Sequence, residues 1–343
     1  MTLDRARLEE TARAMVAEGR GILAADESNA TMTKRLEAVG VESTAESRRF
    51  FRGLMFTAKG AADYISGVIM YDETFRQTTA DGTPFPEFLT GERILPGIKV
   101  DTGAKQLAGF PQEKVTEGLD GLRDRLRDYR ELGARFAKWR AVVRIDAGLP
   151  TRGCLEANAH ALARYAALCQ EAGIVPIVEP EVLMDGEHTI DRSEEVTAAV
   201  LRTVFDRLAE QRVLLEGIVL KPNMLLSGYD CPVQAGVEEV AERTLACFRR
   251  VVPAAVPGIA FLSGGQSDDR AAAHLSAMNT IAGVPWELTF SYGRALVGAP
   301  LRVWSGDDSK VVEAQAALLH RARCNAAARR GEYAESMEHE LVV

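Results

Sequence analysis

Lys221 closes an apolar run, and lysine is a residue type that avoids burial. The run spans residues 218–220 (Ile-Val-Leu), and a Pro-Asn pair follows the lysine. An ordinary lysine amine, with a pKa of about 10.4, is almost entirely protonated at neutral pH. Burial and a neighbouring cation both disfavour the ammonium, and together they lower this pKa by several units. A lysine placed in this way is therefore a candidate nucleophile that attacks a carbonyl and forms an imine.

Other charged residues supply the groups that imine chemistry requires. Lys138 and Arg140 are two residues apart, as are Glu179 and Glu181, so each pair shares one face of an extended strand. We expect Lys138 to supply the neighbouring positive charge for Lys221. Glu179 is the candidate acid–base group for the loss of water that converts a carbinolamine into an imine. A protonated imine is an electron sink, which favours making or breaking the adjacent carbon–carbon bond.

Two glycine-containing segments, SGGQ at 263–266 and SYGR at 291–294, indicate an anion site. Glycines after a strand allow backbone N–H groups to converge on an anion, and the start of a following helix adds its dipole. An arginine can add a bidentate contact to phosphate. With the lysine and the glutamate, these segments predict an imine-forming lyase that acts on a phosphorylated keto-sugar. These two segments contain Ser263, Gly264, Gly265, Ser291, Gly293 and Arg294.

Eight short apolar runs, each ending in polar or glycine residues, must position these side chains. Their spacing of roughly 30 to 45 residues fits one strand and one crossover helix per unit. Continuous apolar runs are typical of parallel strands buried on both faces, and the intervening segments carry helical periodicity. We predict an α/β fold, a closed (β/α)8 TIM barrel with an added C-terminal helix; a doubly wound open sheet is the alternative. The runs lie at 21–26, 65–73, 94–101, 136–146, 174–181, 216–223, 258–266 and 286–294.

A barrel of this kind places its active site at the C-terminal ends of the strands. Asp26 and Lys99 stand at two further strand ends, and the loops after strands seven and eight frequently bind phosphate. Taken singly, Asp26 is typical of a turn and the two glutamates of a solvated strand end, but their occurrence together with several cations favours a site. We expect one domain over 1–343, with the barrel at about 20–300, a helix at about 308–331 capped by residues 307–309, and a tail at 332–343.

Composition excludes several classes of function. The chain has 343 residues, 47% hydrophobic and 26% charged, with a net charge of −8, which argues against a nucleic-acid or acidic-membrane partner. The first residues do not resemble a signal peptide, and there is no apolar stretch of about 18 residues. Five scattered cysteines without a CxxC pair are typical of reduced thiols, so we expect a cytoplasmic protein. The histidines form no metal-binding motif, and we expect no metal or other cofactor.

Two alternatives use the same residues differently. In the first, Asp26, Glu179 and Glu181 bind Mg²⁺ in a metal-assisted enzyme, although the neighbouring lysines would compete for these carboxylates. In the second, the protein binds phosphosugars or serves as a scaffold without catalysis.

The motifs ILAADES, GVIMYDET, ILPGIKVD, FAKWR, IVPIVEPE, LKPNM, FLSGGQS and LTFSYGRAL resemble class I fructose-bisphosphate aldolase, in the same order and at similar spacing. The resemblance runs from about residue 10 to the GEY at 331–333. It implies reversible cleavage of fructose 1,6-bisphosphate to dihydroxyacetone phosphate and glyceraldehyde 3-phosphate in glycolysis and gluconeogenesis. It further implies sugar-phosphate substrates, no metal, and a homo-oligomer, usually a tetramer.

The resemblance also implies a role for each matched residue. Lys221 corresponds to the lysine that forms the imine with the C2 carbonyl, and Glu179 to the residue that assists dehydration, with Glu181 beside it. Lys138 and Arg140 correspond to cations near the carbinolamine and the substrate hydroxyls. Asp26 corresponds to the acceptor of the C4 hydroxyl proton, and the glycine-containing segments to the C1 phosphate site. Four further residues of this chain correspond to family residues near the other phosphate; they are Ser28, Thr31, Arg35 and Lys99.

Three positions depart from the family pattern. Ala30 and Thr31 stand where the pattern has Gly-Ser, and threonine retains the hydroxyl. Asp72 stands where a histidine is common. Many relatives end in a tyrosine that handles the C3 proton of the enamine, whereas the last tyrosine here is Tyr333 and the chain ends MEHELVV. We expect a frayed tail without function. The C3 proton is then left to Glu179, to the substrate phosphate or to another tail group.

Overall fold

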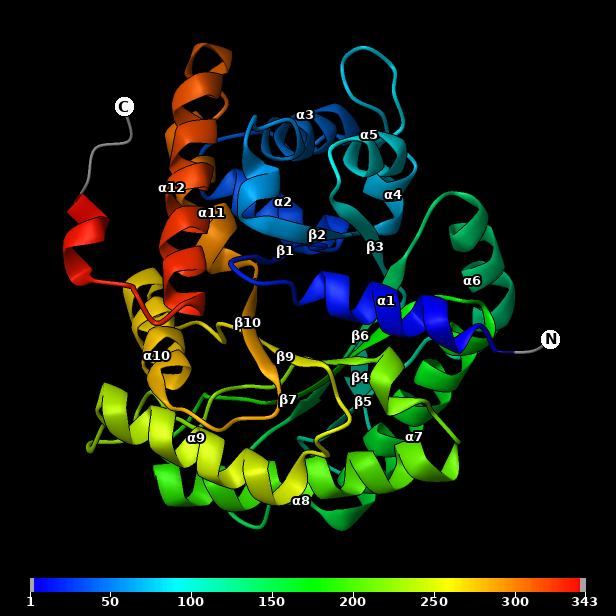
Figure 1. Ribbon diagram of the computed structural model, residues 1–343, viewed down its shortest axis with the longest axis vertical. Coiled ribbons are helices and arrows are strands. Elements are labelled where there is room, and N and C mark those ends of the chain that lie inside the picture. The colour runs from blue at the N-terminus through cyan, green and yellow to red at the C-terminus, as the bar shows by residue number, and fades with distance from the viewer. Residues whose placement is uncertain (1–2, 340–343) are drawn as a thin grey trace.

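The computed structural model describes residues 3–339 and shows a closed, all-parallel barrel (Figure 1). Neighbouring strands follow the order β1-β10-β9-β8-β7-β6-β3-β2, so the open-sheet alternative is wrong and the predicted TIM barrel is confirmed. Each predicted run contributes one barrel strand. The strands are β1 (Gly21–Ala25), β2 (Ile65–Met70), β3 (Leu95–Lys99), β6 (Phe136–Val143), β7 (Val175–Val182), β8 (Val219–Leu220), β9 (Gly258–Phe261) and β10 (Glu287–Tyr292).

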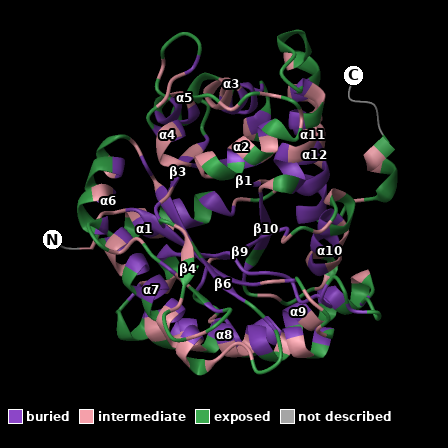
Figure 2. Ribbon diagram, turned by 180° about the vertical axis from the view of Figure 1, so that it is seen from behind, coloured by how far each residue is buried: buried purple, intermediate pink, exposed green. Residues whose placement is uncertain are grey.

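Helices surround the barrel and bury their apolar sides against it. In Figure 2 the barrel strands are largely purple, whereas the helices carry green and pink on their outer sides. The helices are α1 (Arg5–Met15), α2 (Asn29–Glu37), α3 (Ala45–Phe56), α4 (Asp72–Phe75), α5 (Phe85–Gly91), α6 (Leu122–Glu131), α7 (Arg152–Glu171), α8 (Ile190–Glu210), α9 (Val237–Val251), α10 (Asp268–Thr280), α11 (Arg294–Trp304) and α12 (Val311–Arg329).

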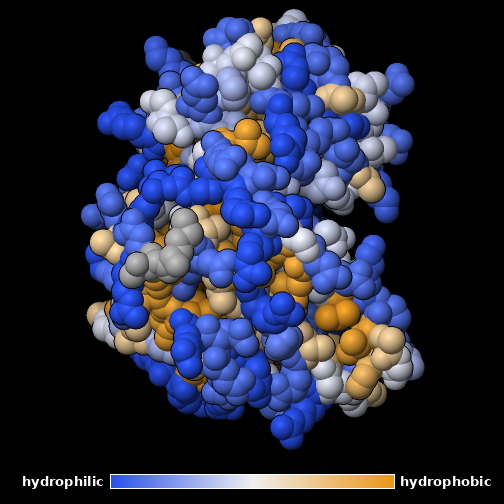
Figure 3. Space-filling view, turned by 90° about the vertical axis from the view of Figure 1, so that its right-hand side faces the viewer, coloured by the Kyte–Doolittle hydropathy of each residue, from blue (hydrophilic) through white to orange (hydrophobic). Residues whose placement is uncertain are grey.

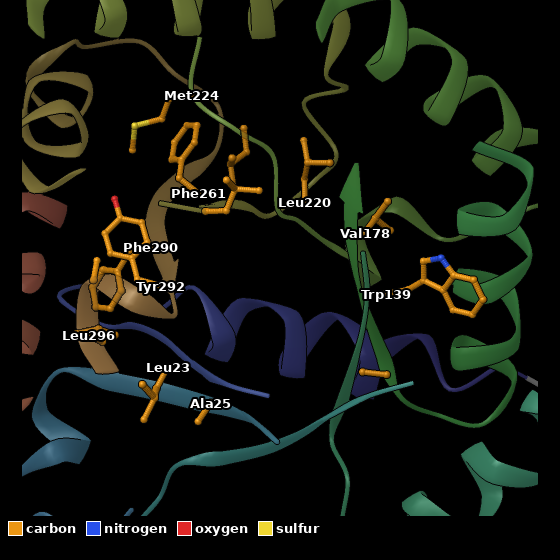
Figure 4. Packing of buried hydrophobic residues seen from close by; sticks show 14 of the residues in the cluster. Leu23, Ala25, Trp139, Val178, Leu220, Met224, Phe261, Phe290, Tyr292 and Leu296 are labelled. Carbon is orange, nitrogen blue, oxygen red and sulfur yellow. The ribbon is translucent and has the colours of Figure 1, made fainter. Parts of the chain in front are cut away.

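Alternating residues along each strand divide the core in two. Odd-even alternation sends successive side chains to opposite faces of a strand. Leu23, Val178 and Leu220 point outward and pack with the helices in the larger cluster, as Figure 4 shows for these residues. The residues inside the barrel form a separate cluster with α1, which comprises Leu8, Ala12, Met15, Val16, Ile22, Ala24, Ile69, Phe136, Val175, Ile177, Val219 and Ala260.

Helix α1 closes the N-terminal end of the barrel. It crosses in front of the strands in Figure 1, and its buried residues share the interior cluster with strand residues. Gly258 permits this approach, because a Cβ atom at that position would lie 2.6 Å from Val16 Cγ1. The interior of the barrel next to α1 is therefore largely apolar, and the charged groups described below lie at the opposite end.

The structure differs from the sequence-based expectation in the loops and at the C-terminus. A short antiparallel hairpin, β4 (Ala104–Gln106) with β5 (Lys114–Thr116), lies between β3 and β6 and was not predicted. Asp307 caps the 3-10 turn η3 (Asp308–Lys310), where it accepts from Ser309 N at 3.0 Å; α12 itself begins at Val311 without a side-chain cap. The predicted cap therefore acts one turn earlier.

The expectation of a frayed tail is wrong for its described part. The 3-10 helix η4 (Glu335–His339) is attached to α12 through Glu338, which is ion-paired with Arg321. Tyr333 also donates its hydroxyl to Glu338 Oε1 at 2.9 Å. Residues 340–343 lie outside the described part of the chain, and the division into a single domain stays a prediction.

The close packing of Phe136, on β6, against Gly97, on β3, can be tested by mutation. A Cβ atom at Gly97 would lie 2.2 Å from the Phe136 ring, so Gly97→Ala should lower the free energy of unfolding by about 1–3 kcal/mol through overpacking. Urea denaturation at fixed protein concentration measures the change. Gly91→Ala is the matched control, because nothing lies within 4 Å of its Cβ position, and it should change stability by less than about 0.5 kcal/mol. Equal stability of the two variants would contradict this packing.

Candidate active site

The C-terminal ends of the strands enclose a cavity of about 1010 Å³. Lys138 and Arg140 on β6, and Glu179 and Glu181 on β7, all line it, because the alternation that sends Trp139 outward sends them inward. The register places Arg140 directly opposite Glu179 on the neighbouring strand. The other predicted residues that line this cavity are Asp26, Ser28, Thr31, Arg35, Lys99, Lys221, Ser263, Gly264, Ser291, Gly293 and Arg294.

Lys221 lies directly after β8 and is only 3% exposed. Its N–H donates to Val178 O at 2.8 Å, which extends the ladder with β7 by one residue and fixes the start of the side chain at the mouth. Burial lowers the pKa of Lys221; Glu179 opposes this effect, and the charge of Lys138 reinforces it. The predicted neighbouring cation is therefore present and acts in the predicted direction.

Asn223 explains the Pro-Asn pair that follows Lys221. Its Oδ1 accepts from Val182 N at 3.0 Å, and its Nδ2 donates to Thr197 Oγ1 at 3.2 Å. The amide thus joins the end of β7 to α8 beneath the site. Both partners are distant in sequence, so the Pro-Asn pair alone does not indicate these contacts.

Two buried lysines in this site have pKa values shifted in opposite directions. Lys138 Nζ lies 2.6 Å from Asp26 Oδ2 and 3.4 Å from Glu179 Oε2. Burial alone would lower the pKa of Lys138, but these carboxylates outweigh burial and raise it. Lys221 Nζ contacts Glu179 Oε1 at 3.1 Å and shares that carboxylate with Lys138. Lys138 is thus a fixed cation, and Lys221 is the lysine that loses its proton more easily.

The carboxylates stay ionised despite their burial. Burial would raise the pKa of Asp26, but Lys138 and Lys221 outweigh it and lower the pKa to about 2. The pKa of Glu179 is also lowered, since Lys138, Lys221 and Arg140 together outweigh its burial. Glu181 pairs with Arg140, and burial and this pairing oppose each other on Arg140, whose pKa is raised overall.

The 263–265 loop has a backbone conformation that requires its glycines. Gly264 and Gly265 have φ of 63° and 100°, a left-handed region that favours glycine. A Cβ atom at Gly265 would lie 2.8 Å from Arg294 Nη2, so glycine also makes room for this guanidinium. Gly265 itself borders the cavity without lining it. Ser291 Oγ is buried without a hydrogen-bonding partner among the described residues.

A second polar group lies across the cavity at the start of α2. Ser28 caps this helix and accepts from Thr31 N at 3.4 Å, while the two hydroxyl oxygens lie 3.2 Å apart. The helix N-terminus therefore faces the cavity together with the cations Arg35 and Lys99.

Two carboxylates at the site were not predicted as site residues. Glu27 is ion-paired with both Arg35 and the buried Arg52 on α3. Asp101 is ion-paired with Lys99 and accepts from Gly103 N and Arg140 N at 3.1 and 3.2 Å. Both stand inside the quoted motifs ILAADES and ILPGIKVD, but the sequence does not show their contacts with Arg52 and with the Arg140 N–H, which are far away along the chain. They hold cations in place at the edge of the cavity.

Asp72 also lines the cavity, and the structure gives it a role. It accepts from the Tyr129 hydroxyl at 2.8 Å and from Arg76 Nε at 2.9 Å. Burial and this hydrogen bond raise the pKa of Tyr129 to about 12. Asp72 thus joins α4 to α6 at the rim.

The carboxylates of the mouth do not form a metal-binding set in the part of the chain that the structure describes. Asp26, Glu179 and Glu181 are each paired with a lysine or an arginine, which opposes the Mg²⁺ alternative. Ligand atoms of His320, Cys324 and Glu338 do lie within 4.8 Å of one another, away from the mouth. In that group Arg321 and Tyr333 already engage the Glu338 carboxylate.

Similarity to known proteins agrees with this geometry. The family model described as "Fructose-bisphosphate aldolase class-I" matches residues 7–342. A probable fructose-bisphosphate aldolase class 1 from Xanthomonas campestris pv. campestris is 55% identical over 328 residues, which cover 95% of this chain and 98% of the relative. A fructose-bisphosphate aldolase from Dictyostelium discoideum is 48% identical over 94% of this chain and 91% of its own length.

A solved structure extends the similarity to the fold. The fructose-bisphosphate aldolase of Plasmodium falciparum, crystallised with TRAP and a small-molecule inhibitor, superposes with a TM-score of 0.94 at 46% identity. The match covers 96% of this chain and 95% of that one. Family model, sequence identity and fold thus agree over nearly the whole length, and the protein belongs to the class I fructose-bisphosphate aldolase family, whose members are carbon–carbon lyases.

Proposed function

We propose that this site cleaves fructose 1,6-bisphosphate reversibly to dihydroxyacetone phosphate and glyceraldehyde 3-phosphate through an imine on Lys221, without a metal. The observation that carries the proposal is the position of the Lys221 amine, which is buried, 3.1 Å from Glu179 Oε1, and has a lowered pKa. A lysine in this setting is activated for attack on a ketone.

During imine formation Glu179 first accepts a proton from Lys221 and later donates it to the substrate. The Lys221 ammonium gives a proton to Glu179, and the free amine attacks the C2 carbonyl to form the carbinolamine. Glu179 then returns the proton to the C2 hydroxyl, which leaves as water, and the protonated imine remains. Lys138 stays charged because Asp26 and Glu179 raise its pKa, and it orients Glu179 throughout.

Cleavage of the C3–C4 bond follows from the charge of the imine. Asp26 accepts the proton of the C4 hydroxyl, the electron pair of the C3–C4 bond moves toward the imine, and an enamine and an aldehyde result. The lowered pKa of Asp26 keeps this acceptor ionised over the neutral range. Arg140, held by Glu181, lies next to Glu179 across the strand register and contacts the substrate hydroxyls.

The two phosphates bind at opposite sides of the cavity. We assign the C1 phosphate to the 263–265 loop, Ser291, Gly293 and Arg294, at the start of α11. The other phosphate is assigned to Ser28, Thr31, Arg35 and Lys99. Tyr333 is excluded as the group that handles the C3 proton, since its hydroxyl is bound to Glu338 and it does not line the cavity.

Two further proposals concern the cellular location and the oligomeric state of the protein. None of the described helices is sufficiently long and apolar to cross a membrane. The described cysteines are all buried and form no disulfide with one another, which supports a cytoplasmic location. Figure 3 shows a mostly hydrophilic face with several apolar patches in its lower half, and such patches favour association with further copies. We propose a homotetramer, which light scattering after size exclusion would measure.

Borohydride trapping tests the role of Lys221. Reduction in the presence of dihydroxyacetone phosphate should inactivate the protein and leave one adduct on Lys221, located by peptide mass spectrometry. Lys221→Met should abolish the adduct and lower kcat by at least about a thousandfold. Lys59→Met, at an exposed lysine outside the site, should leave both unchanged. An adduct only on another lysine would falsify the assignment.

Glu179→Gln tests two roles of Glu179: its acid–base function and the effect of its charge on the pKa of Lys221. The loss of its acid–base function should lower kcat by about 10²- to 10⁴-fold. Because the Glu179 charge raises the pKa of Lys221, the variant should lower this pKa further, and the amine should become reactive at a lower pH. The pH dependence of Lys221 acylation by an amine-directed reagent measures the shift. Glu171→Gln, at an exposed residue paired with Arg123, is the control; a raised Lys221 pKa in Glu179→Gln would contradict the proposed electrostatics.

Ser291→Ala tests the phosphate site. The Ser291 hydroxyl is buried without a hydrogen-bonding partner in the described part of the chain, so its removal should weaken phosphate binding and raise KM about five- to tenfold without loss of stability. Thr289→Val is the control on the same strand. Its hydroxyl donates to Arg20 O at 2.7 Å, so this variant should lose stability and retain its KM. The opposite pattern would refute the assignment of Ser291.

A further inference from the structure

The 263–266 loop is held by hydrogen bonds on two of its carbonyl groups. Ser263 O accepts from Gln266 N at 3.1 Å and from Gln266 Nε2 at 3.0 Å. Gly264 O accepts from the Tyr229 hydroxyl at 3.0 Å. Because the loop contains two adjacent glycines with positive φ, its peptide units are otherwise easy to rotate.

Each of these bonds fixes an N–H group as well as a carbonyl. A trans peptide unit is planar, so its C=O and the following N–H point in opposite directions. When Gln266 binds Ser263 O behind the loop, the Gly264 N–H must point the other way, toward the cavity that Gly264 lines. The Tyr229 bond to Gly264 O fixes the Gly265 N–H in the same manner.

His274 on α10 fixes Gln266 in turn. The ring is fully buried, and Nδ1 lies 2.6 Å from Gln266 Oε1. Since the Gln266 amide nitrogen donates to Ser263 O, its oxygen must accept, and Nδ1 of His274 must therefore carry the hydrogen. Burial and the nearby Arg270 lower the pKa of His274 to about 4, so the ring is neutral near pH 7.

We propose that His274 is a positioning residue for phosphate binding: by fixing the Gln266 side chain, it keeps the N–H groups of the 263–265 loop aimed at the C1 phosphate of the substrate. The inference rests on the proposed function of this site and adds to it a buried residue that does not line the cavity. Gln266 connects the two, because its side chain bonds the ring with one end and the loop with the other.

A purely structural role for His274 predicts a different outcome. As a packing residue it would affect the melting temperature and leave the substrate interactions unchanged. As a positioning residue it affects the affinity for the phosphate group, while the chemistry at Lys221 proceeds once the substrate is bound. The two readouts are the concentration of dihydroxyacetone phosphate that gives half-maximal borohydride trapping, and the trapping rate at saturation.

The test uses His274→Phe, which keeps a ring of similar size but removes the donor, and His274→Asn. The Asn side chain places an N–H donor as many bonds from Cα as Nδ1 is in histidine. His274→Phe should raise the half-saturating concentration about five- to tenfold and leave the saturated rate within about twofold. His274→Asn should restore the half-saturating concentration to within about twofold. Gln266→Met should reproduce the phenylalanine variant, and it keeps the test open if His274→Phe does not fold.

The inference is overturned if His274→Phe and Gln266→Met leave the half-saturating concentration unchanged, or if the saturated rate falls as much as the affinity. Failure of rescue by His274→Asn would also overturn it. Calorimetric binding of dihydroxyacetone phosphate to the same variants gives the affinity without borohydride. An absence of any adduct in the unaltered protein would thus count against the proposed function, while the calorimetric affinities would still decide the role of His274.

Discussion

The structure of this active site depends on the burial of two lysines that share one carboxylate. Removing an ammonium from water is unfavourable, and each lysine is stabilised only by the anions that it reaches. Lys138 is ion-paired with both Asp26 and Glu179, whereas Glu179 is the one ion-pair partner of Lys221 among residues 3–339. One lysine therefore remains a cation, and the other has a lowered pKa. The difference arises from the second carboxylate, since the two side chains are chemically identical.

The apolar barrel interior makes this electrostatic arrangement effective. Beneath the mouth, Val219 and Ile177 belong to the same cluster as α1, which closes the far end. Water is thereby excluded from one side of the charged groups, and their interactions are stronger than they would be in solvent. The cavity lies above these groups, and Arg35, Lys99 and Arg294 also line it.

Hydrogen bonds and ion pairs then fix the polar groups in orientation. Asp101 and Glu27 hold the rim cations, Asn223 joins β7 to α8, and Gln266 connects His274 to the 263–265 loop. Some of these partners are near in sequence, as Lys99 is to Asp101, whereas folding alone brings Val182 and Thr197 to Asn223. An isolated polar residue inside a motif is ambiguous, because its sequence neighbours do not show which distant group it will contact.

The sequence by itself determined the barrel strands and many of the residues that line the cavity, because both depend on local patterns. Apolar runs of the right length specify buried parallel strands, and the period of two places Lys138 with Arg140, and Glu179 with Glu181, on the inward face. Only the tertiary structure decided which lysine pairs with which carboxylate, that β4 and β5 form a hairpin, and that η4 is attached to α12 through Glu338. The physical reason is that pKa shifts, ion pairs and docking contacts depend on distances between residues far apart in the chain, and no local pattern encodes these distances.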